Sequence, residues 1–126
     1  MMNGIKAVVL AIAVALFLKL LVFDFTIAQG HSMEPAIQDG AVLVINRLRY
    51  GVRLQDKYLL RWAKPKEGEV VVFYTPAGEM AVKRCKFLSD DKENFYAEGD
   101  NGSASYDSRS YGEVPLDSIF GKVLGK

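Results

Sequence analysis

The sequence predicts a mainly β domain preceded by one N-terminal transmembrane helix. An apolar segment runs from Ala7 to Phe23, and Lys19 is its only charged residue. The rest of the chain contains short β-branched and aromatic segments separated by turn residues, and no stretch there has convincing helical periodicity. The chain has 126 residues, about enough for one domain. We therefore expect an anchor over residues 1–24 and one β-rich domain over residues 25–126.

The apolar segment is long enough to cross a membrane. As a helix its 17 residues would span about 26 Å, close to the roughly 30 Å hydrocarbon core of a bilayer. Lys19 lies about one turn from its end, where the amine can reach the interface. The competing interpretation is a secretory signal peptide cleaved after Thr26-Ile27-Ala28. Because the segment is longer than the roughly 7–15 residues of a signal-peptide core, we expect an uncleaved anchor.

Short apolar segments bounded by turns predict the strands. Gln38–Gly40 and Pro76–Gly78 have the composition of turns. The expected strands are Ala41–Ile45, Glu69–Thr75, Glu79–Leu88 and Phe95–Ala97, with one more within Val114–Val123. The second and third should form a hairpin around the second turn. No strand is expected in the polar and aromatic stretch that ends at Lys66. The Gly- and Ser-rich segment Glu98–Gly112 is too long for a hairpin turn, so we expect a functional loop.

Charge narrows the range of expected binding partners, and cysteine content indicates how the domain is stabilised. Fourteen Lys and Arg and fourteen Asp and Glu follow residue 24, so the domain is neutral overall. A basic cluster from Arg47 to Lys66, interleaved with aromatic residues, could face nucleic acid or lipid headgroups. Beside a membrane anchor, lipid headgroups are favoured over nucleic acid, and a solvated loop is favoured over both, so we expect no nucleic-acid partner. The single cysteine, Cys85, cannot form an intramolecular disulfide, so the core must provide the stability.

A lysine on an apolar strand face is the first chemical clue. Alternation predicts one face with Ala81, Lys83, Cys85 and Phe87, and an opposite face with Val82, Arg84 and Lys86. We expect Arg84 and Lys86 to face solvent. Burial disfavours the ammonium form of Lys83 and lowers its pKa. To act as a base near neutral pH, that pKa must fall about 2–3 units below its usual 10.4, roughly 3–4 kcal/mol. A neutral lysine can activate a serine nucleophile. The alternative is an edge-strand lysine whose amine reaches water.

Ser32 is the candidate nucleophile. It opens the segment Ser32-Met33-Glu34-Pro35, nine positions after the apolar segment ends. Gly30 permits unusual backbone angles just before it, and Pro35 stiffens the chain just after it. The alternative is a serine that only caps a turn. His31 is the one histidine, but its side chain would have to fold back past its own backbone to reach Ser32, so we expect a polar neighbour rather than a base.

The polar loop carries the most specific pattern. Its sequence from Gly99 to Arg109 resembles the Gly-Asp-Asn-x-x-x-Ser-x-Asp-Ser-Arg box of type I signal peptidases, the serine–lysine leader peptidases. The segment that opens at Ser32 resembles the nucleophile box of this family. Gly68–Phe73 resembles its strand box, and Lys83-Arg84 its general-base box. The four boxes occur in the family's order, and the resemblance covers roughly residues 5–115.

The resemblance implies roles for the catalytic residues. Ser32 would be the nucleophile and Lys83 the general base. Ser105 would hydrogen-bond the Lys83 amine and orient it. Asp107 and Arg109 would form a structural ion pair under the site.

It also implies roles for residues around the catalytic pair. Asp100 would support the loop. The Ser32 N–H would donate to the oxyanion, and Gly30 occupies the position where many members carry a second, hydroxyl donor. Met33 and residues near Val82 would line shallow pockets for small substrate side chains.

The implied protein is a membrane-bound serine endopeptidase that cleaves N-terminal signal peptides from exported preproteins. Its fold would be the β-fold shared by signal peptidases and LexA. It would sit in the cell (inner or plasma) membrane as a single-pass protein, with the catalytic domain on the outer face. Membrane lipid and the preprotein signal peptide would be its partners, and the secretion machinery is a further candidate. No metal or other cofactor is expected.

Some positions depart from the family pattern. Ala36 replaces the usual threonine, and the residues after Arg84 do not continue to the usual Gly-x-Pro-Gly-Asp. Only 15 residues separate Lys83 from Gly99, so the chain would be a minimal form without an inserted second β-domain. Three alternatives stay open: a LexA-like self-cleaving repressor domain, a catalytically inactive membrane-anchored paralogue, and a maturation peptidase dedicated to one secretion, pilus or conjugation client.

Overall fold

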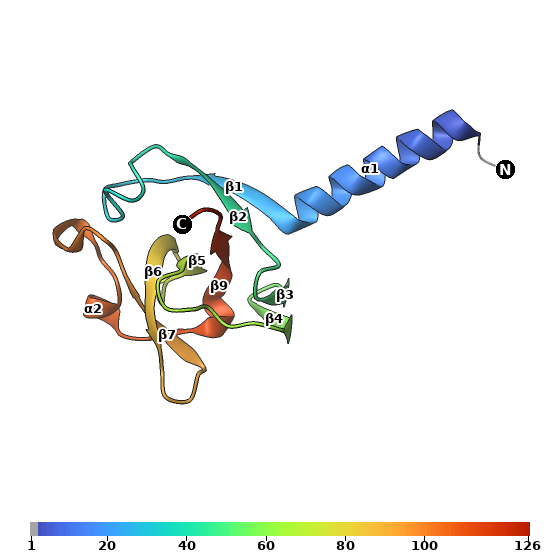
Figure 1. Cartoon of the computed structure of the whole chain (residues 1–126). Coiled ribbons are helices and arrows are strands. Elements are labelled where there is room, and N and C mark those ends of the chain that lie inside the picture. The colour runs from blue at the N-terminus through green and yellow to red at the C-terminus, as the bar shows by residue number, and fades with distance from the viewer. Residues whose placement is uncertain (1–2) are drawn as a thin grey trace.

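The computed structural model describes residues 3–126 and begins with a projecting helix, α1, Gly4–Val22 (Figure 1). The Asn3 side chain caps α1 by accepting a hydrogen bond from the Lys6 N–H at 2.9 Å. Its 19 residues span about 28 Å, and none of them is buried. Within residues 3–126 it is the one helix that is long and apolar enough to cross a membrane.

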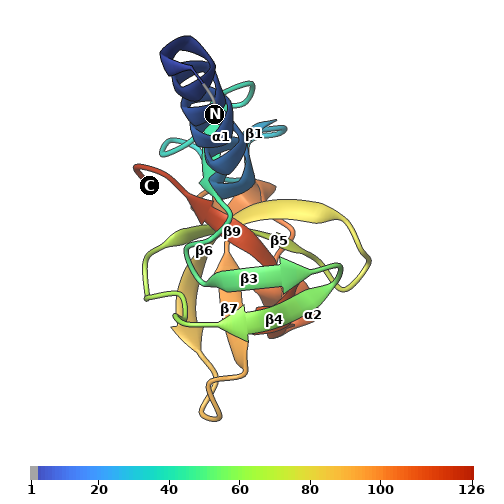
Figure 2. The ribbon, with the colours of Figure 1, turned by 90° about the vertical axis from the view of Figure 1, so that its right-hand side faces the viewer.

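Seven strands form one antiparallel sheet that curls around a core (Figures 1 and 2). In spatial order they are β1 Phe23–Ile27, β2 Val42–Asn46, β9 Ile119–Val123, β5 Val70–Tyr74, β6 Met80–Leu88, β7 Asn94–Glu98 and β8 Val114–Pro115. The structure thus confirms the mainly β class with one N-terminal apolar helix. Strands β2, β5, β6 and β7 also match predicted segments closely. The segment predicted as one strand over residues 114–123 divides into β8, a 3-10 turn at Leu116–Ser118 and β9.

The helix and the sheet join without a linker. The anchor was expected to reach residue 24, but α1 ends at Val22, and Phe23 already pairs with Asn46 as the first residue of β1. The Arg47 N–H donates to the Val22 carbonyl at 2.7 Å, which ties the chain after β2 to the helix end. Strand β1 was not predicted because its apolar residues continue the hydrophobic pattern of the anchor.

A second, two-stranded sheet lies in the stretch for which no strand was expected. It consists of β3, Gly51–Leu54, and β4, Lys57–Arg61, with a register shift between Val52 and Arg53. Sequence inspection missed it because charged residues interrupt the apolar residues there, so no continuous apolar run marks either strand. The predicted polar loop holds a 3-10 turn, Gly102–Ala104, and a short helix, α2, Ser108–Tyr111.

The core has two halves that meet at β5. Val71 and Phe73 belong to one buried cluster, in which Phe73 packs edge-on against Phe95 with ring centroids 5.2 Å apart. Val70 and Val72 belong to the other. That second cluster also contains three buried or half-buried side chains outside β5 that matter for the site, namely Met33, Ile37 and Val82. The chain after β1 is therefore held against the sheet by its own apolar residues.

The alternation predicted for β6 is wrong at Phe87. Lys83 and Cys85 are buried as expected, but the pairing of β6 with β7 shifts register between Cys85 and Phe87. The shift turns Phe87 outward, where its ring stacks on Tyr96 at 4.8 Å and its side chain is 48% exposed.

Candidate active site

A cavity of about 500 Å³ lies between three parts of the chain. Its walls come from the end of β1 and the following turn, from the β5–β6 turn with the first residues of β6, and from the polar loop after β7. Ser32 and Lys83 both line it, as do Met33 and Val82. The structure therefore brings the candidate nucleophile, the candidate base and both candidate pocket residues to one cavity.

A tight turn presents Ser32. Gly30 has φ of +88°, a conformation that favours glycine, and its N–H donates to Asp39 Oδ1 at 2.8 Å. After the serine, Met33 is 4% exposed and Ile37 is 3% exposed, and the Ile37 N–H donates to the Met33 carbonyl at 2.9 Å. Burial on the far side of the turn fixes the backbone and leaves half-buried Ser32 at the cavity wall.

Lys83 projects from β6, where it pairs with Val71 of β5. The residue is only 7% exposed, and it takes part in none of the ion pairs formed within residues 3–126. Burial lowers the pKa of Lys83 below its usual 10.5; the negative charge of Asp107 opposes this effect, and the positive charge of Arg109 adds to it. The amine is therefore easier to deprotonate than a lysine in water.

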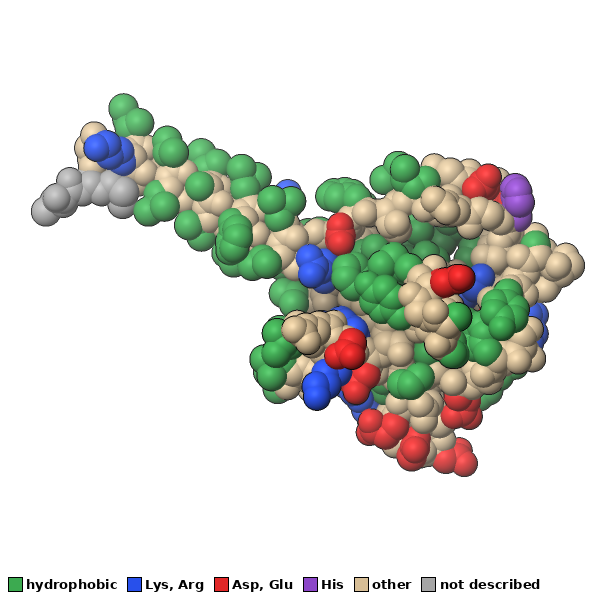
Figure 3. All heavy atoms as spheres, turned by 180° about the vertical axis from the view of Figure 1, so that it is seen from behind, with side chains coloured by type: hydrophobic (Ala, Val, Ile, Leu, Met, Phe, Trp, Pro, Cys, Tyr) green, Lys and Arg blue, Asp and Glu red, His purple; other side chains and the backbone are tan. Residues whose placement is uncertain are grey.

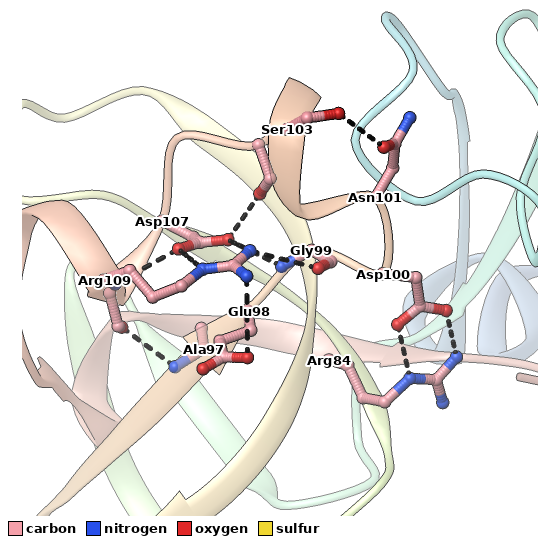
Figure 4. A network of polar contacts seen from close by, with 11 residues as sticks. Arg84, Ala97, Glu98, Gly99, Asp100, Asn101, Ser103, Asp107 and Arg109 are labelled. Carbon is pink, nitrogen blue, oxygen red and sulfur yellow. Dashed lines mark hydrogen bonds and ion pairs between the residues drawn. The ribbon is translucent and has the colours of Figure 1, made fainter.

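Asp107 is the centre of a hydrogen-bond network in the polar loop (Figure 4). The carboxylate is fully buried and accepts a bidentate pair from Arg109, with Nε at 3.0 Å and Nη2 at 2.6 Å. Ser105 Oγ donates to it at 2.5 Å and the Gly99 N–H at 2.8 Å. Burial acts to raise the pKa of Asp107, but the bonds from Arg109, Ser105 and Gly99 outweigh it and hold the pKa far below its ordinary value. Asp107 is therefore a permanent carboxylate whose charge Arg109 compensates.

Ser105 lies in this network through its hydroxyl proton. The Ser105 hydroxyl donates this proton in its hydrogen bond to Asp107. Its oxygen lone pairs are therefore free to accept a hydrogen bond from another donor. The contact with the Lys83 amine implied by the resemblance would use such a lone pair, and it stays a prediction.

The same loop holds the Ser32 turn directly. The Asn101 N–H donates to the Ser32 carbonyl at 2.8 Å, and Asn101 Nδ2 donates to the His31 carbonyl at 3.1 Å. Gly99 lies so close that a Cβ there would be 2.6 Å from the Ser32 carbonyl oxygen. The sequence analysis did not single out Asn101, although its place in the Gly-Asp-Asn box was a signal that could have identified it.

A second ion pair connects the loop to β6 (Figure 4). Arg84 Nε and Nη2 donate to the two oxygens of Asp100 at 2.8 and 2.7 Å, and Arg84 Nη1 donates to the Gly68 carbonyl at 2.7 Å. Arg84 had been expected to face solvent. It instead joins the strand of Lys83 to the loop that holds Ser32, and Asp100 is the loop end of this connection.

His31 also reaches the cavity wall but has a different partner. Its Nδ1 bonds to the Glu34 carboxylate, and its side chain is 64% exposed. The hydrogen bond and the charge of Glu34 raise the pKa of His31. An exposed imidazole whose Nδ1 is bonded to Glu34 is not positioned as the base for Ser32.

One edge of β6 is open at the cavity. Strand β5 pairs with Met80–Arg84 on one side, whereas β7 pairs with β6 only from Arg84 onward. Met80–Lys83 line the cavity with backbone that has no strand partner on the β7 side within the described residues. An extended peptide can add to such an edge. Residues 3–126 contain no group of three or more His, Cys, Asp or Glu side chains placed to hold a metal ion.

Comparison with known proteins gives consistent matches. Residues 1–91 match the family model described as "Signal peptidase, peptidase S26". A signal peptidase I of Bacillus caldolyticus is 25% identical over 127 aligned residues, which cover 90% of this chain and 64% of the relative. A signal peptidase I of Pseudomonas fluorescens is 35% identical over 75 residues, which cover 56% of this chain and 26% of the relative. This chain thus spans less than two thirds of the length of either relative.

Proposed function

Because the chain belongs to the signal peptidase family, peptidase S26, we propose that it is a membrane-bound serine endopeptidase that removes N-terminal signal peptides from exported preproteins. Ser32 is its nucleophile and Lys83 its general base. The observation that carries this proposal is the shared cavity, which is lined both by a serine on a fixed turn and by a buried lysine that forms no ion pair within residues 3–126.

The electrostatics around Lys83 support a neutral amine. A free carboxylate near Asp107's position would hold the lysine protonated, because opposite charges favour the charged form. Here Arg109 forms a bidentate pair with that carboxylate, so its negative charge is largely compensated. Burial is then the dominant influence on Lys83 and lowers its pKa. The Asp107–Arg109 pair supplies hydrogen bonds to the loop without keeping the base protonated.

The proposed reaction has two steps. Neutral Lys83 takes the proton of Ser32 Oγ while the oxygen attacks the scissile carbonyl carbon, and the lysine then gives that proton to the leaving amine. The product is an acyl-enzyme ester on Ser32. Lys83 next removes a proton from water, the hydroxide attacks the ester, and the proton returns to Ser32 Oγ as the acyl group leaves.

The Ser32 backbone supports a further part of the mechanism. Within residues 3–126 no acceptor is hydrogen-bonded to the Ser32 N–H, which leaves it available to the developing oxyanion. Gly30 offers no side-chain hydroxyl as a second donor. Asn101, which holds the Ser32 carbonyl, fixes the direction of the turn in which this N–H lies.

The substrate would bind as an added strand along the open edge of β6. Backbone hydrogen bonds tolerate varied sequences, which suits an enzyme with many preproteins as substrates. Met33 and Val82 would form the apolar floor of pockets for small substrate side chains beside the cut. The domain would lie on the outer face of the cell membrane, anchored by α1.

Cleavage of a model preprotein with an Ala-x-Ala site tests the proposal. We expect the wild type and His31→Ala to produce the mature N-terminus in detergent, and Ser32→Ala and Lys83→Ala to produce none. Product mass identifies the cleaved bond. Activity that survives Ser32→Ala or Lys83→Ala would refute the mechanism. Wild-type inactivity on a panel of preproteins would refute a general signal peptidase, and it would favour a single-client peptidase or an inactive paralogue.

A further inference from the structure

Arg53 and Arg61 of the β3–β4 hairpin point toward the domain. Arg53 Nη1 and the Tyr58 hydroxyl both donate to the Ile119 carbonyl at 2.9 Å, and Arg61 Nη2 donates to Asp117 Oδ1 at 2.7 Å. The two guanidinium groups lie 5.3 and 5.6 Å from the centroid of the Tyr58 ring. These contacts fix which face of the hairpin is turned toward the domain.

The outer face is consequently apolar. Leu59 is 70% exposed, Leu60 60%, Leu54 59% and Trp62 54%. We refer to these four residues as the hairpin patch. A contiguous exposed group of large apolar side chains marks an interaction site on a folded protein. The arginine and tyrosine contacts hold the other face of the hairpin against the domain. A rotation of the hairpin that buried the patch would break these contacts.

The hairpin lies near the C-terminal end of α1, where the helix joins the domain. The Arg47 N–H bonds to the Val22 carbonyl, and Gly51, the first residue of β3, follows only four residues later, a reach of at most about 14 Å. In Figure 1 α1 projects from the side of the domain on which β3 and β4 lie, and Figure 2, viewed from that side, shows the hairpin at the front. Figure 3 shows hydrophobic side chains gathered at the edge of the domain next to α1.

We propose that the hairpin patch rests in the interfacial region of the bilayer that α1 crosses. The inference depends on the proposed membrane anchor and adds a second attachment point. We favour a lipid surface over a protein groove because the hairpin follows closely on the end of a helix that is long and apolar enough to cross a membrane. Trp62 combines an apolar ring with an N–H donor, which suits such an interface. Exposed Lys57 and Lys64 flank the patch and can meet anionic headgroups. Two attachment points would restrict tilting of the domain and hold the cavity at a fixed height above the membrane.

Trp62 is the only tryptophan, so fluorescence excited at wavelengths that tyrosine does not absorb reports on the patch alone. The full-length protein is reconstituted into liposomes that contain lipids brominated at defined acyl positions. We expect bromines near the headgroup to quench Trp62 roughly two-fold more than bromines near the chain ends, because aromatic belts lie at the interface. Iodide in the aqueous phase should quench it weakly. In the double variant Leu59→Ser/Leu60→Ser, quenching by bromine should weaken and quenching by iodide should strengthen.

Two controls keep the result specific. Phe87→Ser removes an exposed apolar side chain from β6, away from α1, and should leave bromine quenching unchanged. Cleavage of a short soluble peptide by Leu59→Ser/Leu60→Ser should match the wild type, which shows that the domain is folded.

Three results would overturn the inference. Strong iodide quenching without bromine quenching would place the patch in water. Protection from both quenchers would place it under a protein partner or a second copy of the chain. Failure of the protein to float with the liposomes would overturn the proposed anchor as well, whereas flotation without bromine quenching overturns this inference alone.

Discussion

Gly99→Ala is the most direct perturbation of the candidate site, because a single methyl group there would clash with both the Ser32 turn and Ser105. A Cβ at this position would lie 2.2 Å from Ser105 Oγ, 2.6 Å from Ser105 Cβ and 2.6 Å from the Ser32 carbonyl oxygen. The Ser32 contact is with backbone and cannot be relieved by rotating a side chain. Gly99→Ala must therefore move the nucleophile turn and Ser105 away from each other.

The size of the effect follows from these distances. Restoring a normal separation of about 3.4 Å requires shifts of roughly 0.8–1.2 Å, and overpacking of this kind costs about 1–3 kcal/mol of stability. A misplacement of about 1 Å at reacting groups can reduce the rate about 10²-fold. We expect Gly99→Ala to lower kcat/KM for a peptide substrate by about that factor while lowering Tm by several degrees.

Gly121→Ala is the matched control. A Cβ at Gly121, in β9, would lie 2.6 Å from the Asn46 carbonyl oxygen, a backbone clash like that at Gly99 but outside the cavity. Both variants should lose similar Tm in detergent, and only Gly99→Ala should lose kcat/KM when assayed well below both melting temperatures. Equal kcat/KM in the two variants would refute the argument that the loop positions Ser32.

Three further results are expected. Lys83→Met should abolish cleavage and raise Tm near pH 7. Because burial lowers the pKa of Lys83, the cost of the buried lysine to folding is complete below its folded-state pKa and disappears as the pH approaches 10.5. A Tm difference between the variant and the wild type that stays the same across this pH range would contradict the assignment. Asp100→Asn removes a bidentate partner of Arg84 that is about a quarter exposed, and thermal melting should show a loss of about 1 kcal/mol or less with kcat/KM reduced less than about ten-fold; a loss as complete as that of Ser32→Ala would assign Asp100 a direct role. Cys85 is buried, and burial raises its pKa to about 11, so iodoacetamide at pH 8 should label the protein by mass spectrometry only after unfolding, and rapid labelling of the native protein would contradict its burial.

Local patterns were sufficient to predict much of the fold. The apolar segment predicted α1, and the β-branched and aromatic segments predicted β2, β5, β6 and β7. Strand β1 was hidden because Phe23–Ile27 continues the hydrophobic pattern of the helix. The β3–β4 hairpin was hidden because its apolar side chains face outward, the reverse of the usual amphipathic pattern. The register shift after Cys85 reversed Phe87, and only the pairing with β7 reveals such a shift.

The residues that line the cavity could be named from the sequence, but their contacts could not. The Gly-Asp-Asn box identified the loop, and alternation identified Lys83 as buried. The bond from the Asn101 N–H to the Ser32 carbonyl joins residues 69 positions apart, and the Arg84–Asp100 pair depends on the curl of the sheet. Long-range contacts of this kind leave no periodic signal in one sequence.

The identity of the general base is the central claim, and the pH dependence of kcat/KM tests it most directly. The acidic limb of this profile reports the pKa of the essential base in the free enzyme. We predict activity that rises with pH through a single apparent pKa below 10.5, because the neutral form of Lys83 is the active one, and an identical limb in His31→Ala. An acidic limb that disappears in His31→Ala would contradict the account and make His31 the base.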